Sequence, residues 1–280
     1  MNSKKLARNV VIGAGVGLYL YLQNTWLQVT KVNLPASGSL AGLKGLRIVQ
    51  LSDLHFPNQG VKISRLISKV AKEKPDLIVI SGDIIEGKKP YQSRDMHEFA
   101  KGLAAIAPTY ATLGNHDIKS NLRQFMVDTL EEEGVTFLQG KPQVLNFKGQ
   151  DYLLMGVDSA PRLFYKQMEN LSSVSFKNEW YELPKLLVSH RPETFENFIE
   201  DPNKAPQITF AGHAHGGQVR LPFFDGLFAP DQGILPSLTA GVFRGIANPE
   251  SLLVISRGIG ASSFPFRINN RPELIVVTIH

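Results

Sequence analysis

The chain has 280 residues, of which 43 % are hydrophobic and 20 % are charged, and this excludes a disordered or collagen-like protein. It contains no cysteine, which excludes disulfide scaffolds, thiolate zinc sites, iron–sulfur centres and cysteine nucleophiles. Lys4, Lys5 and Arg8 supply three charges of the net +5, in a segment without acidic residues. The rest of the chain is nearly neutral, so no nucleic acid is expected as a partner, because such partners require a clustered basic patch.

The N-terminal segment combines this basic flank with an apolar stretch. Residues 10–22 carry neither a charge nor an amide side chain. The stretch is short for a membrane span, which needs about 20 residues, but no small residues follow it at the distance of a cleavage site. We predict an uncleaved signal anchor over residues 1–26, passing once through the cell membrane, with residues 27–280 as one extracytoplasmic domain. A buried N-terminal helix and a cleaved signal peptide are the alternatives.

Beyond the anchor, the hydrophobic pattern predicts strands that alternate with helices. Strands are expected at residues 28–34, 46–51, 77–80 and 109–113, and helices at residues 61–74, 96–106 and 122–133. Strand–helix–strand units of this size are typical of parallel sheets with helical crossovers.

After Gly134 the predicted strands follow one another with few long helices between them. They are expected at residues 144–147, 152–157, 186–188, 208–210, 251–256 and 274–279. The pattern favours an α/β fold in which two sheets pack face to face with helices outside. No domain boundary is expected after residue 30.

Most histidines of the chain, with several aspartates and an asparagine, follow directly after predicted strands. These candidate metal ligands are Asp53, His55, Asp83, Asn115, His190, His213 and His215. Because ligands bind beyond the carboxyl ends of strands in α/β sheets, we expect the seven side chains to meet. Carboxylate, imidazole and amide groups bind divalent metals, and seven donors are too many for one ion and suit two. A single member alone would be interpreted as a cap or an ordinary surface group.

In chain order these motifs read D-x-H, G-D, G-N-H-D, H and G-H-x-H. The set resembles the calcineurin-like metallophosphoesterase superfamily over residues 46–280. Residues 216–218, 221–224 and 257–260 are similar to a bacterial branch of membrane-associated or exported phosphoesterases, which includes UDP-diacylglucosamine pyrophosphatases. The resemblance implies a four-layer α/β/β/α sandwich of two packed mixed sheets.

The resemblance also implies two divalent ions per chain, of manganese, iron, zinc or cobalt. The implied ligands are Asp53, His55 and His215 for one ion, Asn115, His190 and His213 for the other, and Asp83 as the bridge. His116 matches the proton donor of the family. Asp117 follows it and either orients His116 or a metal ligand, or caps the helix that follows.

These features predict a membrane-anchored phosphohydrolase that cleaves a phosphodiester or pyrophosphate bond by attack of a metal-bridging hydroxide. The short link to the anchor keeps the site near the membrane, which favours a lipid-linked or envelope phosphate ester as the substrate. The alternatives are a cytosolic nucleotide phosphodiesterase and a metal-binding scaffold without turnover. The sequence does not predict an oligomeric state.

Two further groups of residues have an open interpretation. The aromatic side chains of the later loops form either an apolar rim for a lipid or membrane surface, or part of the core; they are Phe223, Phe224, Phe228, Phe264 and Phe266. Arg191 and Arg257 are candidate phosphate contacts, for which a structural role is the more common alternative.

Overall fold

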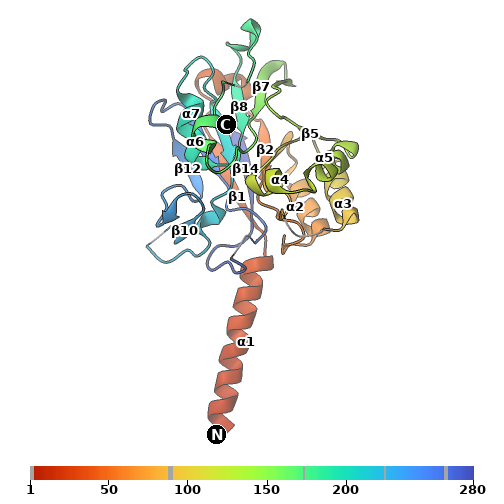
Figure 1. Cartoon of the computed structure of the whole chain (residues 1–280), viewed down its shortest axis with the longest axis vertical. Coiled ribbons are helices and arrows are strands. Elements are labelled where there is room, and N and C mark those ends of the chain that lie inside the picture. The colour runs from red at the N-terminus through yellow and green to blue at the C-terminus, as the bar shows by residue number, and fades with distance from the viewer. Residues whose placement is uncertain (1–2, 88–90, 173, 224, 262–263) are drawn as a thin grey trace.

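The computed structural model describes all residues except 1–2, 88–90, 173, 224 and 262–263 (Figure 1). A long N-terminal helix, α1 (Ser3–Thr25), projects from a body that is built on two six-stranded sheets. Only Trp26 and Leu27 separate this helix from the first strand of the body.

The first sheet has the strand order β1-β14-β2-β3-β4-β5. Its strands are β1 (Gln28–Leu34), β2 (Arg47–Leu51), β3 (Leu77–Ser81), β4 (Thr109–Thr112), β5 (Val135–Phe137) and β14 (Glu273–Ile279). Neighbouring strands are parallel except β14 and β2. The helices α2 (Ile63–Glu73), α3 (Ser93–Ala104) and α5 (Arg123–Glu132) cover its outer face, where Leu66, Phe99 and Met126 pack in one cluster with strand residues.

The second sheet has the strand order β12-β13-β9-β8-β7-β6. Its strands are β6 (Gln143–Phe147), β7 (Gln150–Gly156), β8 (Lys185–Val188), β9 (Ile208–Ala211), β12 (Gly241–Arg244) and β13 (Leu252–Ile255). Short helices accompany it: α6 (Tyr165–Met168), α7 (Phe195–Ile199) and the 3₁₀ turns η2 (Asn178–Trp180) and η3 (Pro192–Thr194). Phe198 of α7 packs with Leu153 and Leu187 on the outer face of this sheet.

The main core lies between the two sheets. Along β3, Ile78 and Ile80 pack with the helices while Val79 packs with Leu186 and Phe210 of the second sheet. Since side chains alternate along a strand, β3 is buried on both faces. The predicted four-layer arrangement of two mixed sheets is confirmed, with long helices in one outer layer and short helices in the other.

The predicted strands all form, each within two residues of its expected ends. The pattern missed β5, β12 and a small hairpin of β10 (Phe228–Ala229) and β11 (Gly233–Ile234). These strands have only two to four residues each. It also missed the short 3₁₀ turn η1 (Gly38–Leu43).

Helix α1 forms over the predicted anchor, and its apolar side chains are uncovered. Val11, Ile12 and Leu18 are 72 %, 57 % and 59 % exposed. Among the described residues, however, no helix has both the length and the apolar character that crossing a membrane requires, so the predicted membrane-spanning anchor is not supported.

The last turns of α1 bind a loop at residues 267–270. The Tyr19 hydroxyl donates to the side chain of Asn269 over 2.7 Å. The side-chain oxygens of Gln23 and Asn24 accept backbone N–H groups of this loop over 3.1 Å each. Three side chains therefore fix the helix to the body at its base.

We expect Ile48→Ala to lower the free energy of unfolding by about 2–5 kcal/mol, because Ile48 is fully buried between the sheets and its loss leaves a cavity. Urea unfolding followed by circular dichroism measures the change. The matched control is Ile12→Ala on the exposed face of α1, which should change this free energy by no more than about 0.5 kcal/mol. Equal effects of the two substitutions would contradict the assignment of the core.

Candidate metal centre

The predicted ligands come together where the strands of both sheets end. Asp53, Asp83 and Asn115 follow β2, β3 and β4 of the first sheet, and His190 and His213 follow β8 and β9 of the second. All five side chains are buried. Because each sheet presents the carboxyl ends of parallel strands at this edge, loops far apart in sequence meet here.

Most of these ligands have an unusual backbone conformation. Their φ angles lie in the left-handed region that favours glycine: 50° for Asp53, 50° for His55, 52° for Asp83, 65° for His213 and 48° for His215. Such residues cost about 1–3 kcal/mol each and concentrate at functional sites. The backbone of these loops is therefore shaped to aim the side chains, at a cost in stability.

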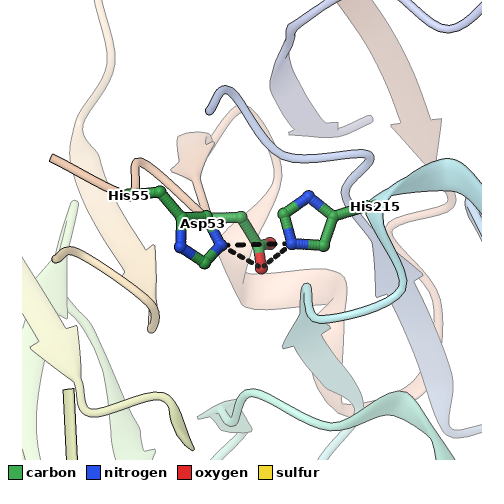
Figure 2. A group of neighbouring side chains, drawn as sticks. All are labelled: Asp53, His55 and His215. Carbon is green, nitrogen blue, oxygen red and sulfur yellow. Dashed lines mark hydrogen bonds and ion pairs between the residues drawn. The ribbon is translucent and has the colours of Figure 1, made fainter. Parts of the chain in front are cut away.

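Asp53, His55 and His215 form the first cluster (Figure 2). The two imidazoles face each other across the Asp53 carboxylate, with 3.1 Å between their Nε2 atoms. The Asp53 Oδ1 atom lies 3.3 Å from Nε2 of His215 and 3.9 Å from Nε2 of His55. The other oxygen of Asp53 accepts hydrogen bonds from the Ser52 hydroxyl and the backbone N–H of His213. Three donor atoms thus face one point.

Asp83, His190 and His213 form the second cluster. The Nε2 atom of His190 lies 3.2 Å from Asp83 Oδ2 and 3.2 Å from Nδ1 of His213. Asn115 lines the pocket beside His213, and its side-chain oxygen is buried without a hydrogen-bond partner. A buried carbonyl oxygen without a partner is costly, and a cation would satisfy it. The donor set therefore fits a divalent ion here.

Asp83 lies between the two clusters. Its Oδ2 atom is 3.2 Å from Nε2 of His190 and 3.7 Å from Nε2 of His55. Its Oδ1 atom accepts the backbone N–H of His116 over 2.8 Å. Residue 114 must be glycine, since a Cβ atom there would lie 2.1 Å from Asp83 Oδ1. One carboxylate can thus serve both clusters.

The buried charges of the centre shift the pKa values of their neighbours. Burial alone would raise the pKa of Asp83, but His190 and then His55 hold it well below its usual range. Burial alone would lower the pKa of His190, but the Asp83 carboxylate raises it to about 10. Histidine binds metal only after losing this proton, so a divalent ion competes with protons for this position.

His116 is the second residue of the short helix α4 (Asn115–Lys119) and lies beside the first cluster, with its ring edge-on to His55. Its Nδ1 atom is 3.3 Å from one oxygen of Glu86, and Nδ1 of His55 is 2.8 Å from the other. Burial alone would raise the pKa of Glu86, but His116 and His55 lower it to about 2. Glu86 was not among the residues predicted from the sequence. Its position, three residues after Asp83 and beyond the end of the same strand, could have indicated that it lies near the site.

Asp117 is fully buried and binds backbone groups. Its carboxylate accepts the N–H groups of Gly114, Ile84 and Ile85, over 2.9, 3.2 and 2.9 Å. The bond to Gly114 caps the first turn of α4. The other two bonds hold the loop that carries Asp83. No described imidazole is a hydrogen-bond partner of Asp117, and the carboxylate beside His116 is Glu86.

A pocket of about 290 Å³ opens beside the second cluster, and its walls include Asn115, His213, Phe228 and Phe264. Phe228 and Phe264 are about half exposed, which favours the interpretation as an apolar rim. Phe223 and Phe266 are also exposed, and Phe224 lies outside the described residues. A larger hollow, of about 420 Å³, lies over α6 and α7 and contains none of the predicted ligands.

The arginines near the centre have structural partners. Arg191 is buried against Glu169, and Arg257 donates to Glu273 over 2.8 Å. Arg267 is fully buried and donates to the Gly260 carbonyl. One of its nitrogens also lies 3.4 Å from Nδ1 of His215. Arg267 therefore places a positive charge behind the first cluster.

Residues 46–217 match the protein family described as calcineurin-like phosphoesterase. The chain is 27 % identical to Phosphodiesterase YaeI of Escherichia coli (strain K12), covering 98 % of this chain and 96 % of that protein. It is 27 % identical to UDP-2,3-diacylglucosamine pyrophosphatase LpxG of Chlamydia muridarum, covering 92 % and 90 %. A solved dimetal phosphatase from Danio rerio superimposes with a TM-score of 0.47 and 11 % identity, covering 85 % and 100 %.

We expect Glu86→Gln to weaken metal binding about 10- to 100-fold, because the carboxylate orients the His55 ligand from behind. Competition with a chelator, followed by metal analysis of the protein, measures the change. The matched control is Glu98→Gln on the exposed face of α3, which should bind metal as the wild type does. Unchanged binding in Glu86→Gln would remove the orienting role.

Proposed function

Because the chain belongs to the calcineurin-like phosphoesterase family, which makes it a metal-dependent hydrolase, we propose that its two clusters hold one divalent ion each. The proposed ligands are Asp53, His55 and His215 for one ion, Asn115, His190 and His213 for the other, and Asp83 for both. The two ions, when bound, attract the phosphate group, offset the charge of the transition state and make water a better nucleophile near neutral pH.

The proposal of two metal sites rests on the position of Asp83. A carboxylate oxygen that lies 3.2 Å and 3.7 Å from one histidine of each cluster suits a shared ligand. The Asn115 oxygen supports the second site, because it is buried without a partner. The backbone N–H of His116 holds the remaining oxygen of Asp83 and so fixes the angle at which the carboxylate enters.

His116 is proposed to protonate the leaving oxygen of the substrate. Its side chain is 26 % exposed, whereas the histidines of the clusters are buried, so it can reach a bound substrate. Burial alone would lower the pKa of His116, but the contact with Glu86 raises it, which favours the protonated ring. Glu86 would hold Nδ1, leaving the Nε2 proton to be donated.

The proposed substrate is a phosphodiester or pyrophosphate at a membrane surface, most simply one linked to a lipid. Two relatives, a phosphodiesterase and a UDP-2,3-diacylglucosamine pyrophosphatase, support this class. The half-exposed Phe228 and Phe264 on the pocket wall would contact the apolar part of such a substrate.

We also propose that α1 attaches the enzyme to the membrane. Its uncovered apolar side chains would be costly in water, and contact with lipid would remove them from water. The base of α1 is hydrogen-bonded to the loop at residues 267–270, which also contains Arg267 beside His215. Attachment through α1 would therefore hold the metal centre close to the lipid surface.

Replacing His116 with alanine tests the proposed chemistry. We expect His116→Ala to keep its bound metal and to slow the hydrolysis of alkyl phosphodiesters about 10²–10⁴-fold. Nitrophenyl esters should slow much less, because nitrophenolate leaves without a proton. Steady-state rates on both substrates and metal analysis measure this, with His97→Ala on α3 as the control. Equal losses on both substrates, or loss of a metal ion, would contradict the role, and a wild type inactive on all diesters would contradict the function.

Membrane attachment can be tested by placing one charge on α1. Val16→Asp should release the protein from membranes, because an aspartate in lipid costs about 2.5–3.5 kcal/mol. Val16 and Val144 of β6 are 53 % and 46 % exposed, so Val144→Asp is the control that should stay bound. Sedimentation of membranes after high-salt and detergent washes shows whether each variant stays bound to the membrane or is released. Release of the wild-type protein by salt alone would contradict the proposal.

A further inference from the structure

The hairpin of β10 and β11 brings an acidic residue to the metal centre from a part of the chain outside the ligand motifs. Its strands pair Phe228 with Ile234 and Ala229 with Gly233, which leaves a three-residue turn. Asp231 occupies the middle of that turn with a φ of 58°, a left-handed conformation that aspartate tolerates better than most residues.

The hairpin is fixed to the loop that carries His213 and His215. The backbone N–H of Leu227 bonds to the carbonyl of Gly217, over 3.1 Å. Gly217 and Gly226 approach so closely that a Cβ on Gly217 would lie 2.4 Å from the Cα of Gly226. The side chain of Gln232 bonds in both directions to the backbone of Leu238 and holds the turn. The position of Asp231 is therefore well defined.

The Asp231 carboxylate reaches a predicted ligand. Its Oδ2 atom lies 3.2 Å from Nε2 of His213 and 3.3 Å from Nε of Arg191. Its Oδ1 atom accepts a hydrogen bond from Nε of Arg162, over 2.9 Å. The side chain is only 8 % exposed. Two arginines thus hold a nearly buried carboxylate against the imidazole.

Asp231 contacts Nε2 of His213, which is the ring nitrogen that faces away from the second cluster. Nδ1 of His213 points at Nε2 of His190, where the ion would bind. A neutral imidazole that binds an ion through Nδ1 carries its proton on Nε2, and this proton needs an acceptor. A carboxylate acceptor fixes the tautomer and the ring orientation, and makes the ligand nitrogen more basic.

The four histidines of the two clusters differ in what lies behind them. Glu86 lies behind His55, and the backbone carbonyl of Ser81 lies behind His190. Behind His215 is the guanidinium of Arg267, which repels positive charge. Each proposed ion therefore has one histidine ligand with a carboxylate behind it. Glu86 lies behind His55 of the first cluster, and Asp231 lies behind His213 of the second.

We propose that Asp231 is a positioning residue for the second metal site, which it serves by accepting the Nε2 proton of His213. The inference rests on the proposed function, since it requires an ion at Nδ1. It also makes the β10–β11 hairpin part of the active centre. The outer side chains of that hairpin, Phe228 and Ile234, are 50 % and 77 % exposed. A molecule that contacts these side chains would act on the metal ligand His213 through Asp231.

The test is a titration of the metal-free, full-length protein with Co²⁺, followed by the visible absorption of the bound ion. The wild type should bind two ions. Asp231→Asn should weaken one of the two binding steps about 10- to 100-fold and change the spectrum of that ion, leaving the other step unchanged. Asp225→Asn is the matched control, because Asp225 lies just before β10, 85 % exposed and paired with Arg220.

Thermal unfolding of the metal-free variants shows whether the hairpin is intact, and Asp231→Glu, which keeps the charge, should recover part of the lost affinity. Unchanged binding in Asp231→Asn, or equal weakening of both steps, would overturn the inference. So would a third ion in the wild type that Asp231→Asn removes, since Glu193, His213 and Asp231 would then form a separate cation site. Fewer than two ions in the wild type would instead overturn the proposed function.

Discussion

The burial of two carboxylates at adjacent strand ends is the constraint on which the rest of this centre depends. Asp53 and Asp83 are 0 % and 1 % exposed. An ionised carboxylate away from water is very costly unless hydrogen bonds and opposite charge surround it. Backbone N–H groups and the Ser52 hydroxyl supply some of the bonds, and Arg267 supplies one charge. The imidazoles supply no charge once they are neutral, as metal binding requires, which is why the arrangement suits two cations rather than a polar core.

The same constraint explains the backbone of the loops. Left-handed residues and very close approaches of glycine to carboxylate, as at Gly114 and Asp83, are unfavourable in isolation. They persist because the strands that enter and leave these loops are buried in the cores of two sheets. The stability of the sandwich thus maintains a geometry that the loops alone would not adopt. The residues proposed to bind metal and the apolar residues that stabilise the fold are almost entirely separate sets.

Sequence alone predicted most of the strands and indicated which residues meet beyond their ends, for one physical reason. Parallel strands end at one edge, so a polar residue directly after a buried strand, such as Asp83 or His190, has few places to point. Glu86 and Asp231 were missed, and the contact of Arg267 with His215 was not predicted, because these contacts depend on how loops fold back and no periodic pattern in the sequence indicates this. The apolar stretch of α1 predicted a helix correctly. Its length and hydropathy, however, do not support a membrane span.

The place of β14 in the first sheet has a consequence for biosynthesis. This strand, made of residues 273–279, lies between β1 and β2 and is the pairing partner of both. On a translating ribosome β14 emerges after all the other strands of the two sheets, so β1 has no strand to join until residues 273–279 leave the exit tunnel. The first sheet therefore closes only after β14 has emerged, and until then two unpaired strand edges remain exposed to the cell's chaperones.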